Sequence, residues 1–204
     1  MFQNLLESNK KVYFLFLCVF TLLLLLVKKQ LIEYETSAFL VLDAQGDLGA
    51  VKMVSFFQYL SIPLVYITKF LLISLLLWIS SFMFGYRITY AQIFGLVIIN
   101  ETLFLLPEII KIIWFLFFTG EVTIYDIRAF YPFSLMNLFD YKELPDYMHY
   151  PLKSLNLFEI IYWITLSFSF HYTIKRKLIN SISVVFIGYV FFYLLWLWFY
   201  IGVA

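Results

Sequence analysis

The sequence predicts an all-α polytopic membrane protein with about five transmembrane helices. The 204-residue chain is 64% hydrophobic and only 13% charged, and its mean hydropathy is +0.92. Soluble domains contain about 45–50% apolar and about 25% charged residues, and disordered chains are less hydrophobic still. The single cysteine, Cys18, excludes a disulfide scaffold. A net charge of +1 gives no reason to expect nucleic acid as a partner, so the lipid bilayer is the expected surrounding.

The first two spans are expected at about 12–28 and 54–85. A spanning helix needs about 20 mainly apolar residues. The first run is flanked by lysines, not by the small residues of a signal-peptide cleavage site, so we interpret it as an uncleaved anchor. The second run contains Pro63 and Lys69 and exceeds one upright span. Either this helix is tilted, or its first part, up to about Pro63, lies at the membrane interface.

The remaining spans are expected at 89–118, 154–174 and 181–203. Thr89 and Gln92 have the spacing of a capping box, which predicts a helix start. Pro107 should kink or split the third run, because proline lacks a backbone N–H. Asn156 and Glu159 repeat the capping spacing, and we interpret both as a helix cap at the outer interface. All five spans belong to a single membrane domain, residues 1–204.

Basic residues predict that the N-terminus is inside and the C-terminus outside. Cytoplasmic loops are enriched in Lys and Arg near span ends, and the densest cluster is 175–177, between the last two spans. With this cluster inside, the turn at Arg87 is also inside, and segments 29–53 and 119–153 are outside. Lys and Arg are equally numerous on the two sides, so their density decides the orientation. Lys28 and Lys29 argue against this orientation, because it places them at the outer end of the first span.

The outer segment 119–153 is expected to carry one or two helices lying flat on the outer leaflet. It is rich in aromatic residues set among prolines and acids, and Thr123 and Asp126 are spaced to start a short helix. Two interpretations stay open. One is an aromatic belt at the lipid headgroups. The other is a docking surface for another membrane protein, since such surfaces are rich in Tyr, Phe and Met. The docking residues would be Tyr125, Phe130, Tyr131, Phe133, Phe139 and Tyr141.

Polar residues within the spans form the second candidate site. This intramembrane cluster comprises Lys69, Asn100, Glu101, Glu108 and Lys111. A charge at the bilayer centre costs roughly 2.5–3.5 kcal/mol on insertion scales, so pairing is expected. We expect Lys69 to pair with Glu101 across antiparallel helices, either as a structural link or as a protonatable or ligand-binding site. Glu108 and Lys111 are spaced to pair on one helix face; alternatively, both reach the outer interface.

Motifs of known catalytic chemistry do not occur in the sequence. There is no His-Glu-x-x-His motif, no Gly-x-Ser-x-Gly motif and no glycine-rich phosphate loop. Neither His149 nor His171 has a neighbour at metal-ligand spacing. We therefore expect a protein that is not an enzyme and that uses no metal or cofactor.

Two stretches resemble the Yip (Ypt/Rab-interacting protein) five-span membrane family and its bacterial relatives. The first is FMFGYRITYAQIFGLVIINETLFLLPEII, in which Gly85, Phe94 and Pro107 match the second-to-third span region. The second is LNLFEIIYWITLSFSFHYTIKRKLINSISVVFIGYVFFYLLW, which resembles the paired last spans of bacterial members. The resemblance implies five spans and covers roughly residues 54–204. The eukaryotic family uses a long soluble N-terminal segment to bind a GTPase partner. This sequence departs from the family in that segment, so a role with a GTPase partner is not expected.

The expected function is a non-enzymatic membrane subunit or scaffold of a larger assembly, related to secretion or transport. Its partners would be other membrane proteins or further copies of the chain. A composition rich in Phe, Ile, Tyr, Asn and Lys indicates an AT-rich bacterial genome, and hence the bacterial cytoplasmic (inner) membrane. Two alternatives stay open: a small permease or transporter component using Glu101 and Lys69 near the midplane, and a lipid-acting membrane enzyme using the acids of the outer segment.

Overall fold

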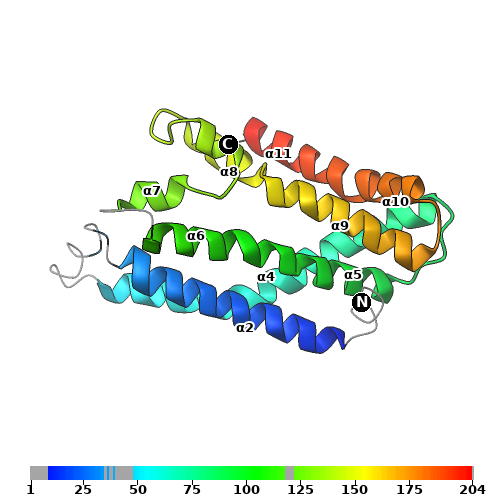
Figure 1. Ribbon diagram of the computed structural model, residues 1–204, viewed down its shortest axis with the longest axis horizontal. Coiled ribbons are helices and arrows are strands. Elements are labelled where there is room, and N and C mark those ends of the chain that lie inside the picture. Colours follow the sequence, from blue (N-terminus) through cyan, green and yellow to red (C-terminus); the bar gives the residue numbers. More distant parts are fainter. Residues whose placement is uncertain (1–8, 35, 37–38, 40–47, 118–121, 204) are drawn as a thin grey trace.

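The computed structural model describes residues 9–34, 36, 39, 48–117 and 122–203. Long helices run roughly antiparallel along the bundle, and short helices cover one end (Figure 1). Four helical stretches in the described part are long and apolar enough to cross a membrane: Lys10–Glu33, Val51–Met83, Tyr90–Phe117 and Leu178–Val203. This agrees with a helical integral membrane protein. The fourth expected span, α9, is not among these four stretches.

The first helix is longer than predicted. Helix α2 (Lys10–Lys28) is capped by Asn9, whose side chain accepts from the backbone N–H of Lys11 at 3.1 Å. It continues as a π-helical turn, η1 (Lys29–Glu33), which was expected to be part of the outer segment. In this turn the Lys29 ammonium is buried and donates to polar side chains of the next helix, α4 (Leu48–Met83). Residues 29–33, predicted as the start of the outer segment, are therefore helical.

Helix α4 (Leu48–Met83) runs through 36 residues without a break at Pro63. At 1.5 Å per residue it is about 54 Å long, well beyond the roughly 30 Å of a bilayer's hydrocarbon core. Figure 1 shows α4 crossing the bundle obliquely. Residues 48–53, predicted as outer segment, form its first turns. Residues 35, 37–38, 40–47 and 119–121 of the predicted outer segments, and residue 118 at the end of the third predicted span, lie outside the described residues.

The third span consists of α5 (Tyr90–Glu101), a 3-10 turn η2 (Thr102–Phe104) and α6 (Leu105–Phe117). The predicted capping box is confirmed, since the Thr89 and Gln92 side chains each bond the other's backbone N–H. The predicted break lies in the turn before Pro107. Proline offers no N–H to the carbonyl four residues earlier, and this favours a tighter turn there.

The last two helices form a hairpin. Helix α9 (Leu157–Ile174) ends at Lys175 in the left-handed conformation, with φ 55°. Helices α10 (Leu178–Val185) and α11 (Phe191–Val203) form one rod through the π-helical turn η4 (Phe186–Val190). This rod crosses α4 closely at Gly188, where a Cβ would lie 2.8 Å from the Cβ of Ser80. A small residue permits this close approach of two backbones.

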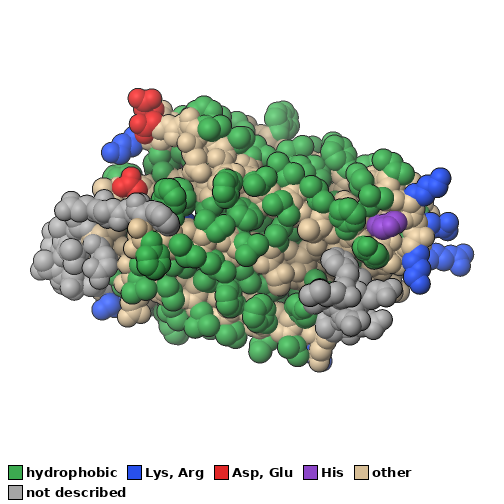
Figure 2. Space-filling model, in the orientation of Figure 1, with side chains coloured by type: hydrophobic (Ala, Val, Ile, Leu, Met, Phe, Trp, Pro, Cys, Tyr) green, Lys and Arg blue, Asp and Glu red, His purple; other side chains and the backbone are tan. Residues whose placement is uncertain are grey.

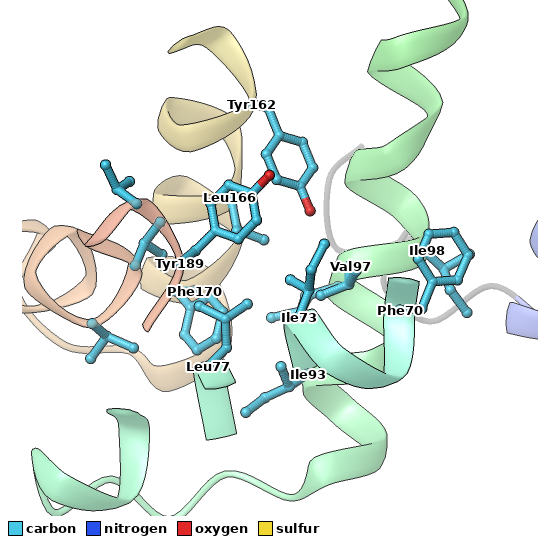
Figure 3. Close-up of a cluster of buried hydrophobic side chains, with 14 of the residues drawn as sticks. Phe70, Ile73, Leu77, Ile93, Val97, Ile98, Tyr162, Leu166, Phe170 and Tyr189 are labelled. Carbon is cyan, nitrogen blue, oxygen red and sulfur yellow. The ribbon is translucent and has the colours of Figure 1, made fainter. Parts of the chain in front are cut away.

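The core lies where α4, α5, α9 and the α10–α11 rod meet. Figure 3 shows Phe70, Leu77, Ile93, Val97 and other apolar side chains filling this space. Tyr162, Leu166 and Phe170 enter it from α9 and are fully buried. Their spacing along α9 places them on one face, which explains why this less apolar helix is held inside the bundle.

The two ends of the bundle differ in structure and charge. The start of α2 and the turns after α4 and α9 lie at one end. Helices α7 (Ile124–Ala129) and α8 (Asp146–Ser154), with the 3-10 turn η3 (Leu135–Leu138), lie at the other. Figure 2 shows Lys, Arg and His side chains gathered at the first end, whereas the second presents acidic and basic side chains together. We call residues 122–156 at the second end the cap.

Candidate functional site

The predicted pair between Lys69 and Glu101 is present. Lys69 Nζ on α4 lies 2.5 Å from Glu101 Oε1 at the end of α5, and 4.7 Å from the ring centroid of Phe104. The Glu101 side chain is 2% exposed and the Lys69 side chain 38%. The second carboxylate oxygen, Glu101 Oε2, is buried and has no hydrogen-bond partner among the described residues. The ion pair therefore gives a partner to only one of the two carboxylate oxygens of Glu101.

Asn100, next to this pair, forms a hydrogen bond to a different helix, α9. Its amide nitrogen donates at 2.8 Å both to the carbonyl of Leu96 and to Ser169 Oγ on α9. Buried amides of this kind link helices inside a membrane bundle. Asn100 therefore connects α5 to α9, whereas Glu101 connects α5 to α4.

Glu159 was interpreted as part of a helix cap, and only half of that interpretation holds. Asn156 caps α9 by accepting from the Glu159 N–H at 2.9 Å. The Glu159 carboxylate, however, is buried and accepts from Trp163 Nε1 at 2.9 Å and from the Tyr189 hydroxyl at 2.8 Å. Glu159, Tyr162, Trp163 and Leu166 are spaced as one helical face, and this spacing could have indicated that Glu159 points inward.

Aromatic rings separate the two buried acids. The ring of Tyr162 lies 5.0 Å from Phe104, near Glu101, and 5.3 Å from Tyr189, which donates to Glu159. Figure 3 shows the Tyr162 and Tyr189 hydroxyls inside the bundle. The Tyr162 hydroxyl has no hydrogen-bond partner in the described part of the chain. The bundle interior thus holds two carboxylates and a tyrosine layer between them.

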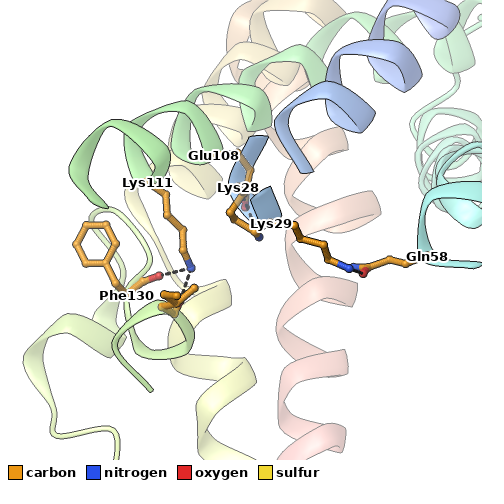
Figure 4. A network of polar contacts seen from close by, with 7 residues as sticks. Lys28, Lys29, Gln58, Glu108, Lys111 and Phe130 are labelled. Carbon is orange, nitrogen blue, oxygen red and sulfur yellow. Dashed lines mark hydrogen bonds and ion pairs between the residues drawn. The ribbon is translucent and has the colours of Figure 1, made fainter. Parts of the chain in front are cut away.

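Glu108 and Lys111 do not form the predicted pair with each other. Glu108 lies 3.7 Å from Lys28 Nζ on α2. Lys111 Nζ is buried and donates to the carbonyls of Ile127, at 2.5 Å, and Phe130, at 2.8 Å (Figure 4). These carbonyls close the C-terminal end of α7, where the helix dipole favours a cation. The intramembrane cluster therefore divides into the Lys69–Glu101 pair, the Asn100 link and a separate group under the cap.

Lys29 lies next to Lys28 of this group, although sequence reasoning did not single it out. Its ammonium donates to Ser55 Oγ at 2.8 Å and Gln58 Oε1 at 2.7 Å, and it lies 5.1 Å from the ring centroid of Tyr59. Figure 4 shows Lys28 beside Glu108 of α6, Lys29 directed toward Gln58 of α4, and Lys111 bonded to the end of α7. Together they join α2, α4, α6 and the cap.

Hydrogen bonds order the cap internally and join it to the start of α9. At the start of α7, Thr123 and Asp126 form the predicted capping box, and these hydrogen bonds lower the pKa of the Asp126 carboxyl. Further along, the Leu135 N–H donates to the Leu155 carbonyl at 3.0 Å, and the Leu157 N–H donates to the Phe133 carbonyl at 3.1 Å. The cap is thus a structured element and not a loose loop.

The six predicted docking residues divide into two groups. Phe130 packs 5.5 Å from both Trp114 and Phe115, and Tyr141 stacks on His149 at 3.9 Å. Tyr131 lines a cavity beside α11. These three are partly buried within the chain. The other three, Tyr125, Phe133 and Phe139, are each more than half exposed.

Phe133 combines exposure with an unusual backbone conformation. Its φ is 54°, a left-handed value that costs roughly 1–2 kcal/mol in residues other than glycine. The residue is 64% exposed, and its ring lies 6.2 Å from that of Phe158. The backbone hydrogen bonds around Phe133 hold this conformation, so the fold keeps an apolar ring directed outward at an energetic cost.

Among the described residues, no group of three or more His, Cys, Asp and Glu side chains could hold a metal ion. Searches for a matching protein family, a similar curated protein and a similar solved structure found none. The resemblance to the Yip family stays a prediction, and the site is interpreted from this chain alone.

Proposed function

We propose that this chain is a non-enzymatic integral membrane subunit that docks onto another membrane protein, or onto a second copy of itself, through its cap. The observation that carries the proposal is Phe133. Its strained backbone holds an exposed aromatic ring that contributes little to the chain's own core. Strained conformations of this kind cluster at functional positions.

The proposal includes a five-span topology. Helix α9 is the fourth of these five spans, because its 18 residues lie between the rods of α5 and α10 and contribute Tyr162, Leu166 and Phe170 to the core. The basic end of the bundle faces the cytoplasm and the cap faces outward, following the preference of Lys and Arg for cytoplasmic loops. The membrane is the inner membrane of a bacterium, with α7 and α8 at its outer interface.

A docking role explains the cap better than an aromatic belt does. A belt needs aromatic rings at the headgroup level and no particular backbone conformation. Here a buried lysine, Lys111, anchors the cap, and backbone pairing with residues 155–157 fixes Phe133. Rigid placement of an aromatic ring lowers the entropic cost of binding a partner, which is typical of interface anchors.

Two substitutions at one position separate docking from folding. Phe133→Gly and Phe133→Ala both remove the ring, but glycine adopts φ 54° without strain. We expect both variants to lose the membrane partner in affinity purification from mild detergent. We also expect the glycine variant to be more stable than the alanine variant by about 1 kcal/mol.

Leu64→Ala, on the exposed face of α4, is the matched control and should retain the partner. If the Phe133 variants co-purify with the same partners as the wild type, the docking proposal is wrong. A self-associating chain would appear in the same experiment as two differently tagged copies recovered together.

A second candidate function is a small permease component that uses Lys69 and Glu101. The specific observation in its favour is Glu101 Oε2, which is buried beside a partly exposed lysine and has no partner in the described part of the chain. Proteoliposomes containing wild-type protein would then show solute or proton flux that Glu101→Gln abolishes. Equal flux from both proteins would refute this candidate.

A further inference from the structure

A groove of about 880 Å³ opens on the side of the bundle between α4, the cap and α11. Ligand cavities in proteins usually measure about 300–1,000 Å³. The long wall is apolar and includes Leu72 and Leu76 of α4 facing Leu195, Trp196 and Phe199 of α11. Several of these side chains are exposed, so the groove opens laterally where lipid chains would surround the bundle.

The polar groups of the groove lie at its floor and at its capped end. At the floor, Lys69 is paired with Glu101, and Glu159 accepts from Trp163 and Tyr189. These charges already have partners within the bundle. The capped end is formed by α8, which contributes Tyr150, Lys153 and Ser154.

Lys153 differs from the lysines at the floor. It is half buried, and its Nζ has no hydrogen bond or ion pair among the described residues. The Nζ lies 5.1 Å from the centroid of the Tyr141 ring. Burial, and then the nearby positive charge of Arg128, lower the pKa of Lys153. A partly desolvated cation next to another cation would gain most from an anion placed in the groove.

We propose that this groove binds an anionic membrane phospholipid, with its phosphate at Lys153 and an acyl chain along the wall between α4 and α11. The polar end and the apolar wall of the groove follow one another as the headgroup and the acyl chain of such a lipid do. A cation lies at the end of the bundle where headgroups would be, and an apolar channel leads from it toward the middle of α4. Tyr150, which also lines the capped end, offers a hydroxyl donor to the same groove.

The closed capped end of the groove favours a lipid chain over a helix as the occupant. Tyr193 donates to the Ser154 carbonyl at 2.7 Å, and Tyr150 packs 4.9 Å from Tyr200, so α8 closes the groove at its capped end. A docked transmembrane helix is about 10 Å across and would need an opening at that end. A single acyl chain enters laterally and needs none.

The test is native mass spectrometry of the full-length protein in detergent, with added phosphatidylglycerol or phosphatidylcholine of the same acyl chains. We expect the wild type to bind phosphatidylglycerol about tenfold more tightly than phosphatidylcholine, because a charge-assisted hydrogen bond contributes a free energy of that size. Lys153→Gln should remove this preference while phosphatidylcholine binding stays the same. Lys142→Gln, at an exposed lysine of the same cap, should keep it.

A second pair of variants tests the wall. Leu76→Trp fills the groove and should reduce binding of both lipids about fivefold, whereas Leu64→Trp, on the same helix outside the groove, should not. Soluble glycerol phosphate at millimolar concentration should not displace bound lipid. The proposal is overturned if Lys153→Gln and Lys142→Gln behave alike, if Leu76→Trp binds lipid as the wild type does, or if glycerol phosphate alone competes.

Discussion

Removing either partner of the Lys69–Glu101 pair should destabilise the bundle by clearly different amounts. Replacing Lys69 with Met leaves the Glu101 carboxylate, which is 2% exposed, without its cation. Breaking a buried pair from one side typically costs about 3–5 kcal/mol, because a charge is left buried and uncompensated. We therefore expect a loss of about 3 kcal/mol or more in the free energy of unfolding.

Replacing Glu101 with Gln should cost much less. The amide oxygen of glutamine can still accept from Lys69, so the ammonium keeps a hydrogen-bond partner within the bundle. A hydrogen bond to a charged group contributes about 1 kcal/mol more than one between neutral groups, and we expect a loss of about 1 kcal/mol. The double variant Lys69→Met/Glu101→Leu, which removes both charges, should be nearly as stable as the wild type.

The assay is reversible unfolding in mixed micelles, followed by tryptophan fluorescence and circular dichroism. The order of stability expected is wild type and the double variant first, then Glu101→Gln, then Lys69→Met. Additive effects in the double variant, or a larger loss from Glu101→Gln than from Lys69→Met, would refute the reasoning that the buried carboxylate dominates.

Three further predictions concern the helix crossing and the cap. Gly188→Ala should destabilise the bundle by about 1–3 kcal/mol through overpacking against α4, whereas Gly202→Ala, with open space around it, should not; unfolding in mixed micelles compares the two. Lys111→Met leaves two carbonyls at the end of α7 without their donor, so hydrogen exchange of residues 122–130 should become faster, and unchanged exchange would contradict the anchoring role. The folded pKa of Asp126 lies below its usual value, so the carboxylate stabilises α7 above the unfolded pKa, and this stabilisation is lost as the pH falls through the folded pKa. Acidification below about pH 4 should therefore loosen α7 in the wild type. An equal response in Asp126→Asn would refute this cause.

Hydrophobic runs and helix-start signals could be predicted from the sequence. The runs at 12–28, 89–118 and 181–203 correspond to helices, and Thr89 and Thr123 cap the helices that follow them. These features depend on local composition and on spacing along one helix. The Lys69–Glu101 pair could also be predicted, because two unlike charges near the middle of adjacent antiparallel helices have few other partners.

Contacts that depend on the three-dimensional order of the helices could not be predicted. Glu108 and Lys111 suit each other on one helix, but Lys28 and the end of α7 lie closer in the folded chain. The left-handed backbone of Phe133 follows from pairing with residues 155–157, which no local pattern around Phe133 indicates. The groove beside α11 likewise exists only once α4 and the cap are placed against it.

The most direct test of the docking account is site-specific photo-cross-linking in native membranes. A photoreactive phenylalanine analogue at position 133 would replace an exposed ring of the cap, and the same analogue at position 64 would face outward from α4. The account predicts one discrete cross-linked membrane protein, or a cross-linked dimer of the chain, from position 133 and none from position 64. Cross-linking to lipid alone from both positions would contradict it.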